Sequence, residues 1–596
     1  MIKKTTFAAF CFAGLLPIAS AKTLSIADFG AKPGGPDTIP ALKQALAAIK
    51  KEQATKLIFP SGTYHFFPDY ADERYCFISN NDEGLKRIAF NLKDFENLEI
   101  DGNGSLFMFH GKINPVILEG SSNIRLKNFA IDFKRSFHSE GVIVADPEEG
   151  LDLRIDPTVF PYEIAGGILT FTDGDQTEER KTTTKSKKIT FPYGGGLEFD
   201  PEKKEPAYLA RDLWVGPAAI AKPLGDGVIR IMDPKLTGTP GNIFIFGPSH
   251  REHPGIVISR SQDTVIEDIT IHHAAGMALI AQLSHNVQIL RMKTGAREGS
   301  GRLLSATADA THFSNCTGKI EIGYCNFQVQ KDDPSNLHGL YARISAQEDD
   351  KTFVIEMIHP QQYGIDFVDP NDELEFVNSR SLVTYGTGKV ASVERINKQL
   401  TRVVMTEAVP KDFKVGDAIA EIRDYPEIHI HNCRMHGNRA RGLLLNCRGK
   451  TLIEDNHFHV PGTAILFESD ASFWYEQGGV RDCTIRGNVF ENGNFGPLEW
   501  GTGVIEVRAG IEDEFKPSSR YNQNITIEDN TFILFDRNAV VRTFSVDGLT
   551  IRNNTIIYSE AYPNRGLKDE LFDISYSDNV VIENNKVQEL PENLTE

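Results

Sequence analysis

Short strands of alternating apolar and polar residues recur along the chain. Each copy joins one alternating strand through a polar turn, rich in Asn or Gly, to a second short strand. The clearest copies are "KIEIGYCNF" (319–327), "EIHIHNCRM" (427–435), "TLIEDNHF" (451–458), "CTIRGNVF" (483–490), "ITIEDNTF" (525–532), "LTIRNNTI" (549–556) and "VVIENNKV" (580–587). Weaker copies occupy 97–107, 123–133, 264–271 and 286–294.

The spacing of these copies predicts the fold. Close copies begin one short period apart, as at 525 and 549, and longer gaps fit the same period plus insertions. A unit this small cannot bury its apolar face alone and must stack on its neighbours. Asn suits the turn because it tolerates left-handed backbone and can bond to the Asn of the next coil. The pattern predicts an all-β fold, a right-handed parallel β-helix.

The segment "DTIPALKQALAAIKKE" predicts a helix that covers the open end of this β-helix. Asp37 is the expected N-cap and Pro40 falls in the first turn. Leu42, Leu46 and Ile49 line one face, which we expect to pack on the first coil.

Two segments, 141–247 and 341–422, interrupt the repeat. Both lack the Asn turn and contain alternating strands typical of antiparallel hairpins, so they predict two small inserted β-barrels. The basic run 178–188 in the first insert is interpreted as a solvated loop. The remaining divisions are N-terminal coils with the cap helix (22–140), central coils (248–340) and C-terminal coils (423–596).

The N-terminal segment 1–21 predicts a cleavable export signal. Lys3 and Lys4 precede an apolar run (7–18), which is followed by the small residues Ala19-Ser20-Ala21. The mature chain is expected to begin at Lys22 and to be secreted or periplasmic. No later stretch approaches the roughly 18 apolar residues of a membrane helix, so membrane insertion is not expected. The oligomeric state is left open.

The charge balance narrows the range of partners. The formal charge is −19, and loss of the two signal lysines makes it −19 − 2 = −21. A surface this acidic disfavours nucleic acid and suits a neutral glycan. After loss of Cys11, six scattered cysteines remain, interpreted as buried small apolar residues. No CxxC or HExxH motif occurs, so neither a metal site nor a cofactor is predicted.

Three acids stand out against this repeat. Asp309 precedes the pair Asp332-Asp333 by the length of one coil. One coil corresponds to a rise of roughly 4.8 Å, so Asp309 and Asp333 should be vertical neighbours on the outer wall. Carboxylates this close cannot all ionise freely, so at least one pKa should rise. This arrangement provides both an acid and a base near neutral pH.

The neighbouring coils extend the candidate site. Aligning Cys325 with Cys433 places Arg441 in register with Asp333. The same alignment pairs Asn446 with His338. Arg343 is a candidate ion-pair partner for Asp332 or Asp333. The further candidate substrate-binding residues are His312, Asn336, Trp474 and Glu476. Paired carboxylates beside an indole suit glycoside hydrolysis, in which two acids act across a sugar bond.

The residue order resembles known carbohydrate-active families. "SIADFGAKPGGPDTIPALKQAL" resembles the N-terminal cap of pectin-degrading β-helix proteins, and the order Asp, Asp-Asp, His-Gly, Arg-Ile is similar to that of polygalacturonases. More closely, "ADATHFSNCTGKIEI" and "QKDDPSNLHGLYARI", with two inserted barrels, resemble glycoside hydrolase family 110.

The family 110 resemblance carries specific expectations. Its members are secreted bacterial exo-α-1,3-galactosidases, and it implies an inverting, metal-independent reaction on glycans with terminal α-galactose, including the blood-group B determinant. It also implies that Asp309, Asp332 and Asp333 are the catalytic acids, with Asp332 expected as proton donor and the other two holding water. The acidic chain departs from polygalacturonases, which bind a polyanion.

Two other function classes remain open at this stage. A polysaccharide lyase on the same fold would bind Ca²⁺ through Asp residues and use Arg343 or Arg441 as base. A non-catalytic surface adhesin would use the Asp column as a glycan-binding ridge.

Overall fold

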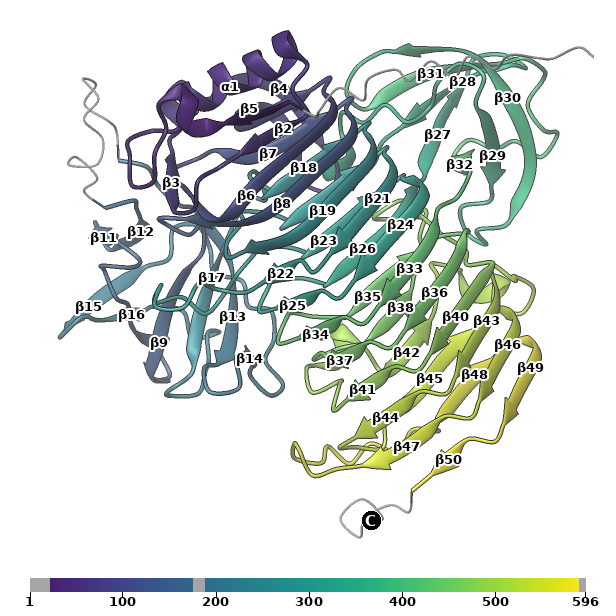
Figure 1. Cartoon of the computed structure of the whole chain (residues 1–596). Helices are drawn as coiled ribbons and strands as arrows, with labels where there is room; N and C mark the ends of the chain where they lie inside the picture. The colour runs from purple at the N-terminus through teal and green to yellow at the C-terminus, as the bar shows by residue number, and fades with distance from the viewer. Residues whose placement is uncertain (1–21, 175–187, 589–596) are drawn as a thin grey trace, which may run out of the picture.

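The computed structural model describes residues 22–174 and 188–588. The predicted export signal and nearly all of the basic run 178–188 therefore lie outside the described residues. Parallel strands stack coil upon coil along the molecule (Figure 1), as the repeat predicts. Within the described residues, no helix is long and apolar enough to cross a membrane.

Each coil contributes strands to two long sheets. One representative coil contains β24 (Thr317–Gly323), β25 (Asn326–Gln328) and β26 (Ser335–Leu340), and the next contains β33 (Glu427–His431), β34 (Arg434–His436) and β35 (Leu443–Asn446). β24 and β25 belong to the first sheet, whereas β26 belongs to the second. Corresponding strands of successive coils pair in parallel.

The other strands of the first sheet are β1 (Thr23–Ser25), β2 (Lys56–Ile58), β3 (Thr63–Phe66), β6 (Glu96–Phe109), β8 (Ser122–Phe133), β19 (Gln262–Ile271), β21 (His285–Leu290), β22 (Lys293–Thr294), β36 (Lys450–Glu454), β37 (His457–His459), β40 (Asp482–Arg486), β41 (Val489–Glu491), β43 (Asn522–Glu528), β44 (Thr531–Leu534), β46 (Val546–Arg552), β47 (Thr555–Tyr558), β49 (Asp578–Glu583) and β50 (Lys586–Val587). The second sheet also contains β4 (Asp72–Ile78), β5 (Asp82–Lys93), β7 (Asn114–Glu119), β18 (Ile256–Ser259), β20 (Leu279–Gln282), β23 (Thr311–Ser314), β38 (Ile465–Phe467), β42 (Gly503–Val507), β45 (Ala539–Phe544) and β48 (Phe572–Ser575). The short strand β39 (Glu476–Gln477) pairs antiparallel with β26.

A ladder of buried asparagines runs through the C-terminal turns. The side-chain amide of each Asn donates to the side-chain oxygen of the Asn one coil onward, at 2.9–3.0 Å, through Asn456, Asn488, Asn530, Asn554 and Asn585. The predicted stacking of turn asparagines is thereby confirmed. Because buried polar groups are costly unless paired, the ladder fixes the register of each coil against the next.

Cysteines take the ladder position in the two preceding coils. The backbone N–H of Cys325 lies 3.3 Å from Sγ of Cys433, whose own N–H donates to Oδ1 of Asn456. All six cysteines of the described chain are free and buried, as predicted. They serve as small apolar residues, Cys76 and Cys483 within strands and the others at turns, and form no cross-link.

The helix α1 (Ile39–Glu52) covers the N-terminal end of the solenoid and buries Leu42, Leu46 and Ile49. The predicted N-cap is wrong by one residue, because the cap position belongs to Thr38. Asp37 acts from one residue earlier: its Oδ1 accepts the backbone N–H groups of Ile39 and Phe67. The same carboxylate therefore satisfies a helix donor and fastens the helix to the chain after β3.

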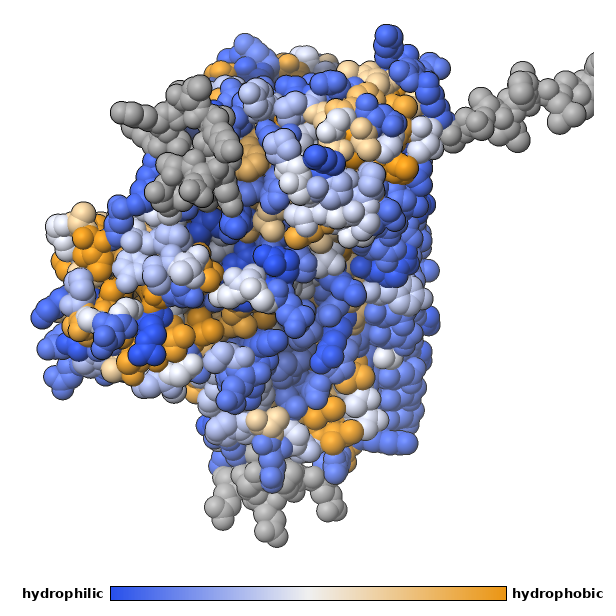
Figure 2. Space-filling model, turned by 60° about the vertical axis from the view of Figure 1, so that its left-hand side comes forward, coloured by the Kyte–Doolittle hydropathy of each residue, from blue (hydrophilic) through white to orange (hydrophobic). Residues whose placement is uncertain are grey.

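The two inserts protrude from the β-helix (Figure 1), and Figure 2 shows a lobe that stands out from a mainly hydrophilic surface. Insert I forms a seven-stranded antiparallel sheet and a separate hairpin, whereas insert II closes into a barrel. Insert I contains β9 (Ser139–Ala145), β10 (Leu151–Arg154), β11 (Tyr162–Ala165), β12 (Ile168–Phe171), β13 (Tyr193–Asp200), β14 (Glu205–Pro206), β15 (Ala221–Gly225), β16 (Val228–Ile231) and β17 (Ile243–Pro248). Insert II contains β27 (Ala342–Gln347), β28 (Thr352–Glu356), β29 (Glu373–Val377), β30 (Thr384–Arg395), β31 (Leu400–Met405) and β32 (Ala418–Ile422).

Candidate active site

A pocket lies where three consecutive strands of the second sheet begin. Thr311 of β23 pairs with Ser335 of β26, which pairs with Leu443 of β35. Two positions before each of these lie Asp309, Asp333 and Arg441. The predicted vertical register of these three residues is therefore confirmed by the strand pairing.

Asp309, Asp332 and Asp333 meet in this pocket. One carboxylate oxygen of each lies within 4.8 Å of the others, and the cavity that they line has a volume of about 220 Å³. The sequence predicts an outward patch, but the three side chains are nearly buried, between 2% and 7% exposed. Segments near Asn80 and Arg251 and the loop 468–476 also line the cavity. Because these segments enclose the acids, loss of solvent is the largest single influence on the pKa of each of the three carboxyl groups.

Arginines hold two of the three acids. Nη2 of Arg251 donates to Oδ2 of Asp332 at 2.7 Å, and Nη1 of Arg439 donates to Oδ1 at 3.0 Å. Arg441 bonds to Asp333 through its backbone N–H and through Nη2, both at 3.0 Å. Both oxygens of Asp332 and of Asp333 are thus engaged by positively charged residues.

Burial and charge separate the pKa values of these acids. Burial alone would raise the pKa of Asp332, but Arg251, Arg439 and Arg441 outweigh it and hold that pKa below its usual value. Burial raises the pKa of Asp333 to about 7, and the opposing effect of Arg441 is too small to cancel this. At neutral pH the adjacent pair therefore contains a firmly ionised carboxylate and one poised to accept a proton.

The third acid shares a proton with a histidine. Oδ2 of Asp309 lies 2.6 Å from Nδ1 of His312, and Nε2 of His312 lies 2.9 Å from Nε2 of His338. Nδ1 of His338 lies 2.7 Å from the carbonyl oxygen of Gly339. That oxygen can only accept, so His338 carries its proton on Nδ1 and accepts on Nε2. His312 then donates from Nε2, and one further proton lies between its Nδ1 and Asp309.

The pKa directions agree with this chain of hydrogen bonds. Burial, followed by the negative charge of Asp332, raises the pKa of Asp309 to about 8. Burial lowers the pKa of His312 to about 4 and also lowers that of His338. Both rings are therefore neutral at pH 7, and the shared proton lies on Asp309. The structure thus places the available proton there, not on Asp332, the donor expected from the sequence.

Four of the other predicted residues line the same pocket: Asn336, Asn446, Trp474 and Glu476. Trp474 is 40% exposed and packs on His359, with ring centroids 4.3 Å apart. Oε1 of Glu476 accepts from Asn80 at 3.3 Å and from Asn336 at 3.5 Å.

Two residues that line the pocket each have an unpaired amide atom. Among the described residues, Oδ1 of Asn336 and Nδ2 of Asn446 are buried without a hydrogen-bond partner. Buried polar groups are normally paired. One of these atoms accepts and the other donates, a combination that suits sugar hydroxyls, which do both.

Two predicted binding residues lie elsewhere. Arg343 does not pair with the acids: it faces Glu356 across the first two strands of insert II, with Nη2 2.6 Å from its carboxylate. Arg343 lies on β27, the first strand of insert II, and strand pairing therefore places its side chain beside Glu356 on β28. His338 does not itself line the pocket, and it contacts the site through two lining residues, His312 and Glu476.

Arg251, Arg439 and Asn80 were not predicted. Arg439 precedes Arg441 by two positions, and this spacing could have revealed it. Arg251 follows insert I and Asn80 precedes β5, where no repeat places them against the acids. The other lining residues missed by sequence reasoning come from 468–470 and from Leu444.

A second hollow adjoins the first. It has a volume of about 460 Å³ and shares Arg251, Asp332 and Arg439 with the acid pocket. Its other walls include Glu252 and Lys331. Burial lowers the pKa of Lys331 to about 8. The two hollows therefore lie side by side, with the ion-paired residues Arg251, Asp332 and Arg439 lining both.

Comparisons with known proteins place the chain in a family. GLAA-B β-barrel domain I matches residues 139–243, GLAA-B β-barrel domain II matches 352–419, and a right-handed β-helix region matches 422–591. Among solved structures, the A-module of mannuronan C-5 epimerase AlgE6 from Azotobacter vinelandii is 11% identical, covers 94% of this chain and 99% of its own, and gives a TM-score of 0.38.

Curated relatives match over nearly the whole length. α-1,3-Galactosidase A of Shewanella woodyi is 36% identical over 577 residues, covering 95% of this chain and 91% of the relative. α-1,3-Galactosidase B of Bacteroides thetaiotaomicron is 31% identical over 579 residues, covering 96% and 92%. The chain belongs to the α-1,3-galactosidase A/B family, the glycoside hydrolases that carry the two GLAA-B β-barrel domains.

Proposed function

We propose that this protein is an exo-acting α-1,3-galactosidase that removes terminal galactose by an inverting reaction. The observation that supports it is the enclosed group of three carboxylates, one holding a proton and the others paired with arginines. The linkage and sugar come from its relatives, which are named α-1,3-galactosidases. Linear Galα1-3Gal chains and the branched blood-group B determinant are the proposed substrates.

In the proposed mechanism Asp309 is the general acid. It passes the proton shared with His312 to the glycosidic oxygen as the bond to C1 breaks. Asp333 is the general base, because its pKa of about 7 is closer to the working pH than that of Asp332. It takes a proton from the water that attacks C1. Asp332 stays ionised and stabilises the positive charge that develops on the sugar ring.

Water is the proposed nucleophile because the arginines already engage both oxygens of Asp332 and of Asp333. The closest oxygens of the three acids lie within 4.8 Å of one another. This separation is nearer to the ~5–5.5 Å of retaining enzymes than to the ~6.5–9.5 Å of inverting ones. The proposal of inversion therefore rests on the three-acid arrangement, and the anomer of the product is its decisive test.

The size of the pocket supports exo action. A cavity of about 220 Å³ is smaller than the ~300–1,000 Å³ typical of small-molecule sites, so it suits one sugar unit. The adjoining hollow of about 460 Å³ would receive the rest of the glycan. Trp474 offers an apolar ring face to the sugar.

The charges of the site support a neutral substrate. Arg251, Arg439 and Arg441 all pair with the catalytic acids, so their charge is balanced within the protein. The same arginines supply the positive charge that Ca²⁺ would supply in a lyase. The unpaired amide atoms of Asn336 and Asn446 match the hydroxyl groups of a neutral sugar.

The experiment is proton NMR of the first sugar released from a panel of α- and β-linked galactosides. We expect galactose only from terminal α-1,3 linkages, with the β-anomer appearing first. Initial release of α-galactose would overturn the proposed inversion but would still agree with the proposed hydrolysis. Absence of galactose from every member of the panel would overturn the proposed function itself.

A further inference from the structure

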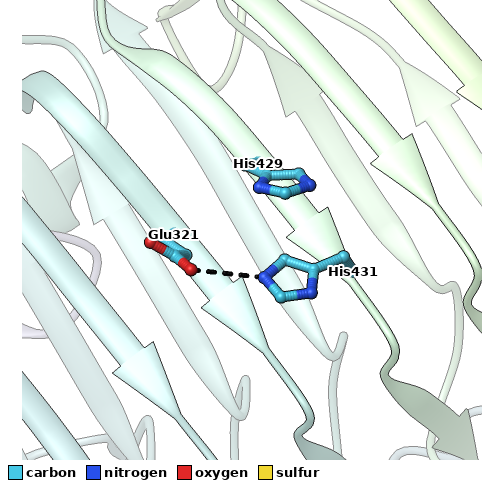
Figure 3. A group of neighbouring side chains, drawn as sticks. All are labelled: Glu321, His429 and His431. Atoms are coloured by element: carbon cyan, nitrogen blue, oxygen red, sulfur yellow. Dashed lines mark hydrogen bonds and ion pairs between the residues drawn. The ribbon is translucent and has the colours of Figure 1, made fainter.

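A second cluster of chemically active side chains lies on the first sheet. Glu321 on β24 pairs in register with His429 on β33. His431 follows two positions later on the same strand, so both histidines point to the same face of the sheet. Figure 3 shows the three side chains together, with the carboxylate of Glu321 and the ring of His431 turned toward each other.

The ligand atoms of this cluster converge. One nitrogen from each histidine and one oxygen of Glu321 lie within 4.8 Å of one another. Nε2 of His431 is 3.3 Å from Oε1 of Glu321, close to the separation between two ligands of one tetrahedral ion with bonds of ~2.0–2.2 Å. The two rings stack with centroids 4.2 Å apart. All three side chains are partly accessible from solvent, so an ion can reach them.

The hydrogen bonds around His431 favour a cation in this gap. Its Nδ1 lies 3.0 Å from the side-chain oxygen of Asn432, which can only accept. With the Asn432 amide in this orientation, the neutral ring carries its proton on Nδ1 and turns the lone pair of Nε2 toward the negative oxygen of Glu321. Two acceptors this close repel unless a positive ion lies between them. Either a second proton on the ring or a metal ion satisfies this geometry.

Neighbouring side chains hold the ligands in place. Lys319 and Gln288 bond to Oε2 of Glu321, at 2.8 Å and 3.4 Å, which leaves Oε1 turned toward His431. Oε1 of Glu454 on β36 lies 2.9 Å from Nε2 of His429, and its other oxygen bonds to Arg486. A carboxylate that orients a ligating histidine is a common feature of metal sites.

We propose that Glu321, His429 and His431 bind one borderline divalent metal ion, such as Zn²⁺, on the outer face of the β-helix. Two imidazoles and one carboxylate from neighbouring strands form a donor set that zinc accepts, with water free to complete the coordination. Mg²⁺ and Ca²⁺ prefer sites made entirely of oxygen ligands. The sequence alone predicts no metal, because Glu321 and His429 lie far apart in the chain and no short motif links them.

The position of the site gives the ion a structural role. In sequence, insert II lies between the coil that contains β24 and the coil that contains β33. The chain therefore passes from one coil to the next only through a separate barrel. The same two coils also carry Asp333 and Arg441, which lie just before their strands in the second sheet and bond to each other. A metal ion that links Glu321 to His429 and His431 fastens these coils to each other. It lies on another sheet from the acids and takes no part in the reaction.

Calorimetric titration of the chelator-treated full-length protein with zinc chloride tests the proposal. We expect about one equivalent of Zn²⁺ to bind, with no heat from Mg²⁺ or Ca²⁺. His429→Ala, His431→Ala and Glu321→Gln should each weaken Zn²⁺ binding at least tenfold. His457→Ala is the matched control: it removes a half-buried histidine of β37 that pairs with the carboxylate of Glu491. Its Zn²⁺ affinity should equal that of the wild type.

Thermal unfolding provides a readout independent of activity. Zn²⁺ should raise the Tm of the wild type and of His457→Ala, but not of the three ligand variants, because binding to the folded state alone stabilises it. An Asp309→Asn variant should retain the Tm shift, which separates this cluster from the three acids. The proposal fails if the wild type binds no stoichiometric Zn²⁺, or if the ligand variants keep its affinity or its Tm shift.

Discussion

Asp309 and His312 share one proton across 2.6 Å, at one end of a hydrogen-bond chain that runs through His338 to the carbonyl oxygen of Gly339. Because both histidines are neutral, Asp309 holds the proton in a pocket where Asp332 stays ionised. This relationship assigns the acid of the proposed reaction.

Leaving-group dependence tests that assignment. Asp309→Asn should lower kcat on a Galα1-3Gal substrate by about 10²–10⁴-fold, the usual contribution of a general acid. It should keep most activity on an aryl α-galactoside whose leaving group needs no proton. Asp333→Asn should lose activity on both substrates, since water activation is needed for each. Parallel kcat measurements decide: if Asp332→Asn shows the leaving-group dependence instead, the acid is misassigned.

The pH dependence of kcat/KM follows from the raised pKa of Asp309. The folded-state pKa of Asp309 is raised to about 8, so the acid stays protonated until the pH passes that value. We expect kcat/KM to fall on the alkaline side with an apparent pKa near 8, measured at constant ionic strength. In Asp309→Asn this alkaline limb should disappear from the residual activity on the aryl substrate. A limb that persists there would have to come from another group.

The raised pKa also predicts a pH-dependent stability difference. A group whose folded pKa exceeds its unfolded value of ~3.9 stabilises the fold fully only below that unfolded pKa. Its contribution is lost as pH rises from there toward about 8. Asn resembles the protonated acid and can donate to Nδ1 of His312. The Tm of Asp309→Asn relative to wild type should therefore increase between pH 5 and pH 8, and a constant difference would contradict the raised pKa.

His338 is a positioning residue, because it contacts the lining residues His312 and Glu476 but does not itself line the pocket. His338→Ala removes the acceptor for His312 and should lower kcat by up to about tenfold with little change in KM, as expected for one lost hydrogen bond. The alkaline pKa of the rate profile should shift with it. His338→Gln, which restores an acceptor oxygen, should recover part of kcat. Equal losses in both variants would indicate a purely steric role.

The second hollow should discriminate between long and short substrates. Glu252 lines it without lining the acid pocket. Glu252→Gln should raise KM for a trisaccharide by about 2- to 10-fold, the equivalent of one hydrogen bond. KM for an aryl galactoside should not change. Glu583→Gln on the distant strand β49 is the control. If both substrates are affected equally, the glycan does not extend into this hollow.

The asparagine ladder should support stability and not catalysis. Asn530 bonds to Asn554 and to the carbonyl of Ile485, and it accepts from the amide of Asn488. Asn530→Ala removes these buried hydrogen bonds and should lower the free energy of unfolding by about 2–3 kcal/mol in urea denaturation. Thr526→Ala, on the preceding strand β43, is the control. The kcat of Asn530→Ala should remain at the wild-type value. A loss of kcat without a loss of stability would contradict a purely structural role for the ladder.

Residue spacing alone predicted the vertical neighbours of the site. One period of the repeat is one coil, and strand pairing then sets the height of each residue, so Asp309, Asp333 and Arg441 follow from counting. The turn asparagines were predictable for the same reason, because identical residues on successive coils lie at hydrogen-bonding distance. Such local, repeated geometry needs no knowledge of the rest of the fold.

Only the tertiary structure decided how the site is enclosed and charged. Arg251 and Asn80 come from segments outside the local repeat, and Arg343 turns to Glu356 because strand pairing within insert II determines its neighbour. The pKa values depend on desolvation, and thus on the segments that close over the acids. Periodicity determines which residues stack, whereas enclosure by distant segments determines which of them carries the proton.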